Sequence, residues 1–523
     1  MPRYKLFSSP FLIAATLLCA AVFTMLLFIG LLNNGQFAFT LDDPYIHLAL
    51  AKQLALGNYG INSGEFAAPA SSILWPFLLI PATLTPLSEY LVVLINTCFA
   101  LLSLWFFVRL LVLLEQSSHK KLRKSIWAFL FIVFSNQLGL IFIGMEHQLQ
   151  VLLVVVIFYG MLRHQQGLAV SKTVFILLAI APLVRFELFA LTVPACLYWL
   201  LTGKSKQALA SVIFQILFVG LFCGFLFLQN GQILPDSVLV KSAKLGESEL
   251  GFISNFWRNL HLPKGVLLLC CSCLFFHTAW FRYINFTTRC FYFCIGLSIL
   301  LHLLFGRIGW YFRYEIATWV LAGLGLFYLY TNPVLSHEGK TARKVTRGLS
   351  VLVIFLSLVE HSIAAASSPY AASNIYHQQY QMARFIQAHY AKPVAVNDLG
   401  QVSFHNETYI LDLWGLASTE ARKLKNQKDP SWMAQLCQQH QVGLAMIYQN
   451  AVWFPEVPTQ WIKVAELQIE GPIIVSRYPV SFYATKPSEV AYIKQALSDF
   501  SLSLPAKSRL QFSQNIRAWK VIN

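Results

Sequence analysis

The stretch from residue 11 to residue 47 reads FLIAATLLCAAVFTMLLFIGLLNNGQFAFTLDDPYIH. Its first part, Phe11 to Leu32, is a continuous apolar run, and about 20 such residues suffice to cross a bilayer as a helix. A cleaved signal peptide has a shorter apolar core of about 7–15 residues, so we interpret this run as an uncleaved first membrane helix. Asp42 and Asp43 follow shortly after its C-terminal end. Ionised carboxylates are costly at membrane depth and are normally retained there for function.

The composition agrees with a membrane-embedded chain. Of 523 residues, 57% are hydrophobic and only 12% are charged, with a mean hydropathy of +0.58, whereas soluble domains carry about 25% charged residues. The net charge is +16, but the cations sit in short clusters between apolar runs. That pattern fits the positive-inside bias and anionic headgroups better than nucleic acid. We therefore expect membrane lipids, and no nucleic acid, as partners.

Apolar runs predict about eleven membrane spans. They lie near residues 11–33, 88–113, 126–143, 147–163, 172–186, 188–202, 208–228, 264–280, 290–305, 315–331 and 348–366. Residues 71–86 are too short and too proline-rich to span, so we expect a helix lying at the interface there.

Basic residues in alternate connectors set the orientation. The positive-inside rule places these connectors and the N-terminus in the cytoplasm. The opposite, extracytoplasmic side then receives the loop 34–87, Glu146, the segments 185–187, 231–244 and 307–313, and everything after about residue 367. Polar groups that interrupt the apolar pattern thus collect on one face of the membrane.

The region 367–523 regains the composition of a soluble domain. Strands are predicted near 394–400, 409–413 and 442–448, and helices near 376–390 and 430–440. Such alternation is typical of an α/β domain. The predicted fold is therefore an α-helical polytopic membrane protein, residues 1–366, with a C-terminal extracytoplasmic α/β domain, residues 367–523.

The adjacent acids have two interpretations. Two neighbouring carboxylates repel, which raises the proton affinity of one and makes it a plausible base. Acids in a first turn, followed by Pro44, also suit the N-terminus of a helix. His47 lies one helical turn from Asp43 and either orients it or is a plain surface histidine.

Several short motifs follow one another along the chain. They are Asp42-Asp43-Pro44-Tyr45-Ile46, Gly144-Met145-Glu146, Arg185-Phe186-Glu187, the loop from Gly231 to Lys241, Gly309 to Tyr314, Asn397 to Gly400, and Leu411 to Leu416. Together they resemble the GT-C superfamily of integral membrane glycosyltransferases, which use polyprenyl-phosphate sugars. The likeness is to bacterial members related to mycobacterial arabinofuranosyltransferases, and more loosely to protein mannosyltransferases and lipid A aminoarabinose transferases. Phe186 and Asp236 depart from the Pro and Asn of those motifs.

The resemblance implies roles for the extracytoplasmic residues. The acid of the first loop is the catalytic base, which maps to Asp42 or Asp43, and we favour Asp42. Tyr45, His47, Glu146 and Glu187 are expected in the substrate pocket.

A departing polyprenyl phosphate needs cations, and arginine offers it bidentate geometry. We expect them among Arg185, Lys241, Lys244, Arg307 and Arg313. Each has a plainer interpretation. Arg307 and Arg313 can snorkel to headgroups, Lys241 and Lys244 can be solvated loop residues, and Arg185 can pair with Glu187. Glu146 can cap the following helix.

The predicted activity is inverting transfer of a hexosyl or pentosyl unit from a polyprenyl-phosphate donor to an extracytoplasmic glycan, lipid or protein. The expected location is the bacterial inner membrane, with a periplasmic C-terminal domain. A secondary transporter or lipid flippase is the alternative, although transporters tend to show internal repeats and mid-membrane charges. A scaffold whose soluble domain binds cell-wall polymer is a third interpretation.

The cysteines show no zinc-type spacing, and no cofactor is assigned. A divalent cation held by Asp42, Asp43 and Glu146 is left open.

Overall fold

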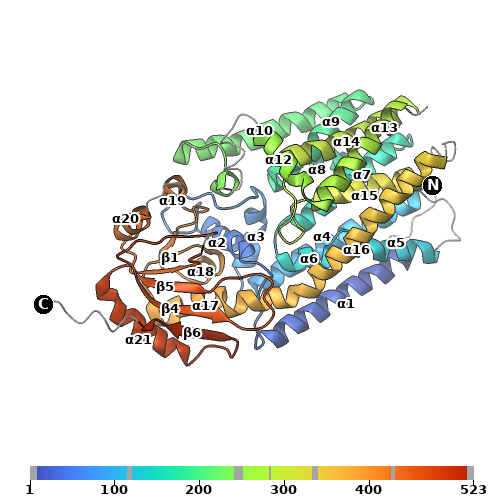
Figure 1. Cartoon of the computed structure of the whole chain (residues 1–523). Helices are drawn as coiled ribbons and strands as arrows, with labels where there is room; N and C mark the ends of the chain where they lie inside the picture. The colour runs from blue at the N-terminus through green and yellow to red at the C-terminus, as the bar shows by residue number, and fades with distance from the viewer. Residues whose placement is uncertain are drawn as a thin grey trace.

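The computed structural model describes residues 9–114, 121–240, 251–281, 284–331, 340–425, 430–450 and 452–514. A helical bundle forms one part of the molecule and a mixed sheet the other (Figure 1). Between them lie α2 (Asp43–Ala55), α3 (Trp75–Thr83) and α18 (Gly400–His405) (Figure 1). Lys241 and Lys244, predicted to bind phosphate, fall outside the described residues.

The bundle contains the long apolar helices. In chain order its elements are α1 (Ser9–Leu32), α4 (Ser88–Leu114), α5 (Lys121–Phe134), α6 (Gln137–Ile143), α7 (His147–Gln165), α8 (Lys172–Val184), the 3-10 turn η1 (Phe186–Leu188), α9 (Phe189–Leu201), α10 (Ser205–Asn230), α12 (Gly251–Leu260), α13 (Pro263–Phe281), α14 (Phe286–Phe305), α15 (Ile316–Thr331) and α16 (Lys340–His377).

In the described parts of the chain, eight helical segments are long and apolar enough to cross a membrane. They are Ser9–Leu32, Ser88–Leu114, Lys121–Ile143, His147–Gln165, Ser205–Asn230, Pro263–Phe281, Phe286–Phe305 and Arg343–Tyr390. Three shorter apolar helices, Lys172–Val184, Phe186–Leu201 and Ile316–Thr331, match the remaining predicted spans. The predicted polytopic helical fold is confirmed.

Burial separates the centre of the bundle from its surface. Every residue of α7 from His147 to Leu162 is buried, whereas the outer helices expose large apolar side chains such as Phe23, Leu217 and Leu221. A helix that is apolar all round is either a core helix or a membrane helix. Here α7 is a core helix, and the outer helices have the exposed apolar surface of membrane helices.

The predicted span 126–143 is divided into α5 and α6. Asn136 adopts a left-handed conformation with φ 52°, a region that asparagine tolerates better than most residues. α6 then ends at Gly144, φ 72°, where a Cβ would lie 2.6 Å from the ring of Phe39. This tight turn places Glu146 at the start of α7.

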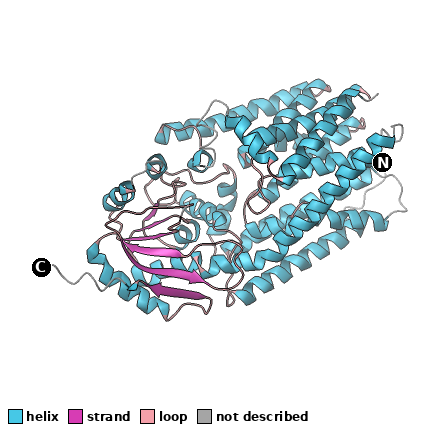
Figure 2. Ribbon diagram, in the orientation of Figure 1, coloured by secondary structure: helices cyan, strands magenta, loops and turns pink. Residues whose placement is uncertain are grey.

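The C-terminal part contains a six-stranded sheet with helices around it (Figure 2). Its strands are β1 (Val394–Val396), β2 (Ile410–Asp412), β3 (Leu444–Ile447), β4 (Ile462–Ile469), β5 (Val480–Ala484) and β6 (Ser508–Phe512), in the order β2-β1-β3-β5-β4-β6. Its helical elements are α17 (Gln379–Phe385), the π-helical turn η3 (Ile386–Tyr390), α19 (Thr419–Leu424), α20 (Ser431–Gln439), the 3-10 turn η4 (Pro487–Glu489) and α21 (Val490–Ser501). The predicted α/β class and its first three strands are confirmed, and β4 to β6 are additional.

The strand directions bring acidic residues together. β2, β1 and β3 run parallel, with Val396 paired to Asp412, while β5, β4 and β6 are antiparallel. Carboxyl ends of parallel strands share one edge of a sheet, where sites tend to form. Asp412 ends β2, and Asp398 follows β1 at the same edge.

The long helix α16 joins the bundle to the C-terminal part. It runs unbroken from Lys340 to His377, so the expected boundary at 366/367 falls inside a helix. The division into residues 1–366 and 367–523 stays a prediction.

Contacts from several loops hold the C-terminal part against the bundle. The side-chain amide of Asn62 donates to the Ile410 carbonyl at 3.0 Å and accepts from the Ile410 N–H at 2.9 Å, as a neighbouring strand would. Asp236 is fully buried and accepts from Arg422 Nε at 2.9 Å. The loop that follows α10 is thereby fixed to α19.

Gly400 marks the closest approach. A Cβ at this position would lie 2.1 Å from the Asp42 carbonyl oxygen and 2.8 Å from its carboxylate. Because backbone lies on the other side, no side-chain adjustment makes room, so α18 docks on α2 only with glycine here.

We expect Gly400→Ala to destabilise the protein by about 1–3 kcal/mol, as overpacking does, and to expose the C-terminal part to protease. Thermal unfolding and limited proteolysis in detergent measure both effects. Gly348→Ala is the matched control, because a Cβ there meets nothing within 4 Å. Equal stability of the two variants would contradict the docking described above.

Candidate active site

Asp42 faces the C-terminal part of the chain. Its Oδ2 accepts from the Gly400 N–H at 2.6 Å and its Oδ1 from the Gln401 N–H at 2.9 Å. Both oxygens therefore accept hydrogen bonds from the first turn of α18, whose donors lie 358 and 359 residues away in sequence. The capping interpretation of the acidic pair thus applies to a distant helix rather than to α2 itself.

A second acid lies close to Asp42. Asp398 Oδ2 accepts from the Tyr448 hydroxyl at 2.7 Å and from Gln379 Nε2 at 2.9 Å. Burial, followed by the charge of Asp398, raises the pKa of Asp42 to about 8, and burial also raises the pKa of Asp398. The interface between α2 and α18 therefore favours a protonated carboxyl at neutral pH.

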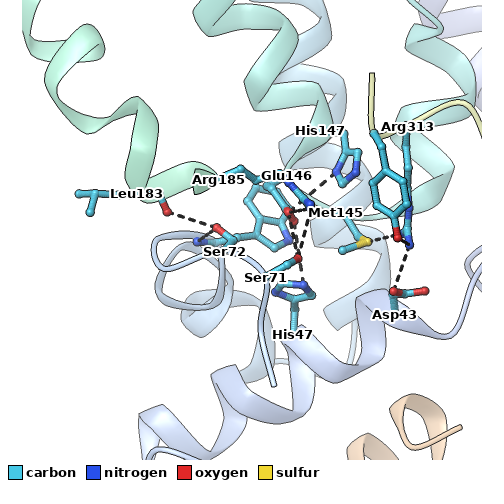
Figure 3. A network of polar contacts seen from close by, with 12 residues as sticks. Asp43, His47, Ser71, Ser72, Met145, Glu146, His147, Leu183, Arg185 and Arg313 are labelled. Atoms are coloured by element: carbon cyan, nitrogen blue, oxygen red, sulfur yellow. Dashed lines mark hydrogen bonds and ion pairs between the residues drawn. The ribbon is translucent and has the colours of Figure 1, made fainter. Parts of the chain in front are cut away.

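Asp43 faces the bundle instead. Its Oδ1 lies 3.1 Å from Nη2 of Arg313, a side chain with 0% exposure, whereas the Asp43 side chain is 27% exposed. Arg313 also donates through Nη1 to the Met145 sulfur at 2.7 Å. Asp43 is thus a partly exposed carboxylate that faces Arg313 (Figure 3), a cation buried in the bundle.

Glu146 and Glu187 share Arg185. Arg185 Nη1 donates to Glu146 Oε1 at 2.8 Å, and its Nε and Nη2 donate to the two oxygens of Glu187 at 3.1 and 2.7 Å. Glu146 is fully buried and makes no side-chain cap of α7, while Glu187 is 36% exposed. The pairing of Arg185 with Glu187 is as the plainer interpretation expected.

Two histidines and a serine surround Glu146. His47 Nε2 lies 4.0 Å from Glu146 Oε2, and His147 Nδ1 lies 3.9 Å from Oε1. Ser71 Oγ lies 3.4 Å from Glu146 Oε1 and accepts from Arg185 at 3.2 Å. Figure 3 shows His47 pointing at Glu146. His47 is therefore a buried part of this network rather than a surface residue.

Tyr314 joins the two networks. The guanidinium carbon of Arg313 lies 5.1 Å from its ring centroid, and that of Arg185 lies 5.7 Å from it. Both distances are within the range of cation–π attraction. The residues predicted on separate loops thus converge on one end of the bundle.

The remaining predicted residues take other positions. Tyr45 is fully buried, and its hydroxyl accepts from the Phe39 N–H at 3.1 Å, which makes it part of the core. Arg307 is half-buried at the end of α14. Partial burial, followed by the charge of Arg307, lowers the pKa of Arg258 of α12. Two neighbouring guanidinium groups suit a phosphate.

Some residues of this region were not predicted as site residues. Arg258, Lys264 and Glu315 were passed over, although Lys264 and Glu315 are charges at the ends of predicted spans, the signal that singled out Arg313. Asp398 belongs to a quoted motif but was assigned no role.

The three acids for which a divalent cation was left open contact different partners. Asp42 accepts from α18, Asp43 pairs with Arg313, and Glu146 pairs with Arg185. Within the described residues, no group of three or more His, Cys, Asp or Glu side chains is arranged to hold a metal ion.

The chain matches one family model and is similar to two solved structures. Residues 373–483 match the family model "Domain of unknown function (DUF8728)". No curated protein matches. Two solved structures of the Archaeoglobus fulgidus oligosaccharyltransferase are similar. One is tethered to an acceptor peptide containing the NVT sequon (TM-score 0.39, 11% identity, covering 94% of this chain and 75% of that one). The other is a complex with Zn and sulfate (TM-score 0.35, 10% identity, covering 94% and 74%). Both TM-scores are below 0.5.

The raised pKa of Asp42 predicts a pH-dependent interface. A carboxyl that is protonated in the docked state and ionised when released stabilises docking at low pH. This stabilisation is lost as pH rises from about 4 through about 8. We expect thermal unfolding temperature to fall over this range in the native protein and to fall less in Asp42→Asn. Parallel curves for the two proteins would rule out a titrating Asp42.

Proposed function

We propose that this protein is an inverting glycosyltransferase that uses a polyprenyl-phosphate sugar and acts at the extracytoplasmic end of its helical bundle. The observation that carries the proposal is the Asp43–Arg313 pair, a reachable carboxylate fixed by a fully buried cation. A base must be both accessible to the acceptor hydroxyl and correctly oriented, and Asp43 meets both requirements.

Asp43 is the better base of the two acids, contrary to the preference for Asp42 from the sequence. Both Asp42 oxygens accept backbone N–H groups of α18, so an acceptor hydroxyl reaches them only if the C-terminal part moves away. The raised pKa of Asp42 comes from this burial. We therefore assign Asp42 a positioning role: it holds the N-terminus of α2, which begins with Asp43, against α18.

The reaction needs one base and a stabilised leaving group. Asp43 takes the proton of the acceptor hydroxyl as that oxygen attacks the anomeric carbon, and the carbon–oxygen bond to the phosphate breaks on the opposite face. The phosphate leaves as an anion without being protonated, so no paired acid of the glycosidase type is required. Direct displacement inverts the anomeric centre.

Arg307 and Arg258 are the cations we assign to the leaving phosphate. Arg313 is enclosed and neutralises Asp43, while Arg185 donates to Glu146, Glu187 and Ser71. Arg307 is half-buried and Arg258 is exposed. α12 also exposes Phe252, Ile253 and Trp257, apolar side chains that suit a lipid surface.

Glu187, half-exposed beside the buried Arg185, is a candidate contact for a sugar hydroxyl. α18 and the edge formed by Asp398 and Asp412 cover the same end of the bundle, so we assign the acceptor to the space next to the C-terminal part. A polypeptide, a lipid and a glycan remain equal candidates for this acceptor.

Asp43→Asn is expected to lower sugar transfer at least about 100-fold, the smaller end of what a general base contributes. The side chain keeps its size but loses its ability to accept a proton and the charge that pairs with Arg313. Initial rates of purified protein with a panel of polyprenyl-phosphate sugars measure this loss, with folding monitored by thermal unfolding.

Asp42→Asn is the paired variant. It is expected to retain more transfer activity than Asp43→Asn does, although one docking hydrogen bond to α18 is lost. Full activity in Asp43→Asn, or inactivity confined to Asp42→Asn, would falsify the assignment of the base.

The double variant Arg258→Gln/Arg307→Gln is expected to raise the donor KM about 10-fold or more, since a hydrogen bond to a charged group contributes about 1.5–3 kcal/mol. KM and kcat for the lipid donor measure the effect. Arg109→Gln is the control, because Arg109 of α4 lies over the rings of Trp105 and of Tyr159 in α7, away from the proposed phosphate. An unchanged KM would remove these two residues from the donor site.

A further inference from the structure

A second buried ionic cluster contacts the loop that carries Arg313. Lys264 Nζ lies 2.7 Å from Glu315 Oε1 and 2.7 Å from Glu360 Oε2. The side chains of Lys264 and Glu315 are 4% and 0% exposed. Charges so deeply buried are costly unless they are paired and hydrogen-bonded, so their arrangement is specified by the fold.

The loop between α14 and α15 has an unusual backbone. Gly309 has φ 107°, and the next three residues, Trp310, Tyr311 and Phe312, have φ 47°, 61° and 57°. Left-handed conformations are unfavourable for residues with a side chain and occur singly as a rule. Three in succession persist only when surrounding contacts enforce them. Arg313 follows immediately.

Glu315 supplies such a contact. Its Oε2 accepts from the Gly309 N–H at 2.9 Å, so its side chain ties the start of the left-handed turn to its end. Its other oxygen is held by Lys264, whose Nζ also lies 4.8 Å from the ring centroid of Phe312. One ion pair thereby contacts both the first and the last residue of the turn 309–312.

Further contacts secure the two flanks of the loop. Asn255 and Asn259 of α12 donate to the Gly306 carbonyl at 2.7 and 3.0 Å. The Tyr311 hydroxyl lies 3.0 Å from Ser367 Oγ of α16. Within this set, only the Lys264–Glu315 pair closes the turn directly before Arg313.

We propose that Lys264 and Glu315 are positioning residues, whose buried ion pair holds the left-handed turn 309–312 so that Arg313 meets Asp43. The positions of the atoms support this independently of the reaction, whereas its effect on catalysis rests on the proposed function. The pair touches no predicted substrate group and acts through Arg313.

The structural arm of the test measures amide hydrogen exchange in residues 306–315. Glu315→Met removes the acceptor of the Gly309 N–H, and we expect exchange of this segment to become at least about 10-fold faster. Lys264→Met is expected to give a similar change and Lys264→Arg a smaller one. Lys392→Met, which removes the exposed pair with Glu489, is the matched control. Unchanged exchange in both Met variants overturns the proposal.

The catalytic arm measures the pH dependence of kcat/KM. Arg313 favours the ionised form of Asp43, so a loosened Arg313 shifts the acid limb of the profile to higher pH, by roughly 1 pH unit for the loss of a close opposite charge. A purely structural defect lowers the amount of folded enzyme without moving this limb. The double variant Lys264→Met/Glu315→Met removes one charge of each sign and leaves the partly exposed Glu360 without Lys264, so it is expected to fold and to show the same shift.

The outcomes separate the two claims. If the native protein transfers no sugar from any polyprenyl-phosphate donor, the proposed function fails, and the exchange experiment still decides whether the pair holds the turn. If transfer is present and exchange rises but the acid limb stays in place in every variant, the positioning role is refuted while the enzyme assignment stands.

Discussion

The first turn of α2 directs two neighbouring carboxylates to different partners. Successive residues of an α-helix point about 100° apart, so Asp42 and Asp43 cannot face the same group. Asp42 accepts two N–H groups of α18, and Asp43 pairs with Arg313. The first contact attaches the C-terminal part to the bundle, and the second attaches the loop before α15 to the same helix.

The charges at the site are nearly all neutralised within the protein. Arg313 pairs with Asp43, Arg185 with Glu146 and Glu187, and Lys264 with Glu315. Removing one member of a buried pair leaves a charge uncompensated, which costs about 3–5 kcal/mol. Such a network resists rearrangement, and it therefore presents Asp43 to a ligand in one orientation.

The sequence predicted the apolar helices and the gathering of polar motifs because both depend on local patterns. Run length predicts a span, and the end of a span predicts where a charge lies. The partners of Asp42, Asp43 and Glu146 were not predictable, because they depend on helix rotation and on the parallel register that places Asp398 near Asp42. β6 was missed because its side chains alternate between buried and exposed, so it forms no apolar run. Lys264 was counted as part of a predicted span rather than as a charge at its edge.

β2 lies at the edge of the sheet, and the Asn62 amide occupies both backbone groups of Ile410. An unprotected edge invites pairing with another chain. Asn62 precedes Ile410 of β2 by 348 residues. The protecting amide is therefore synthesised long before the strand that it covers. Expressed without the preceding segment, the sheet would emerge with this edge bare, and self-association would compete with its folding.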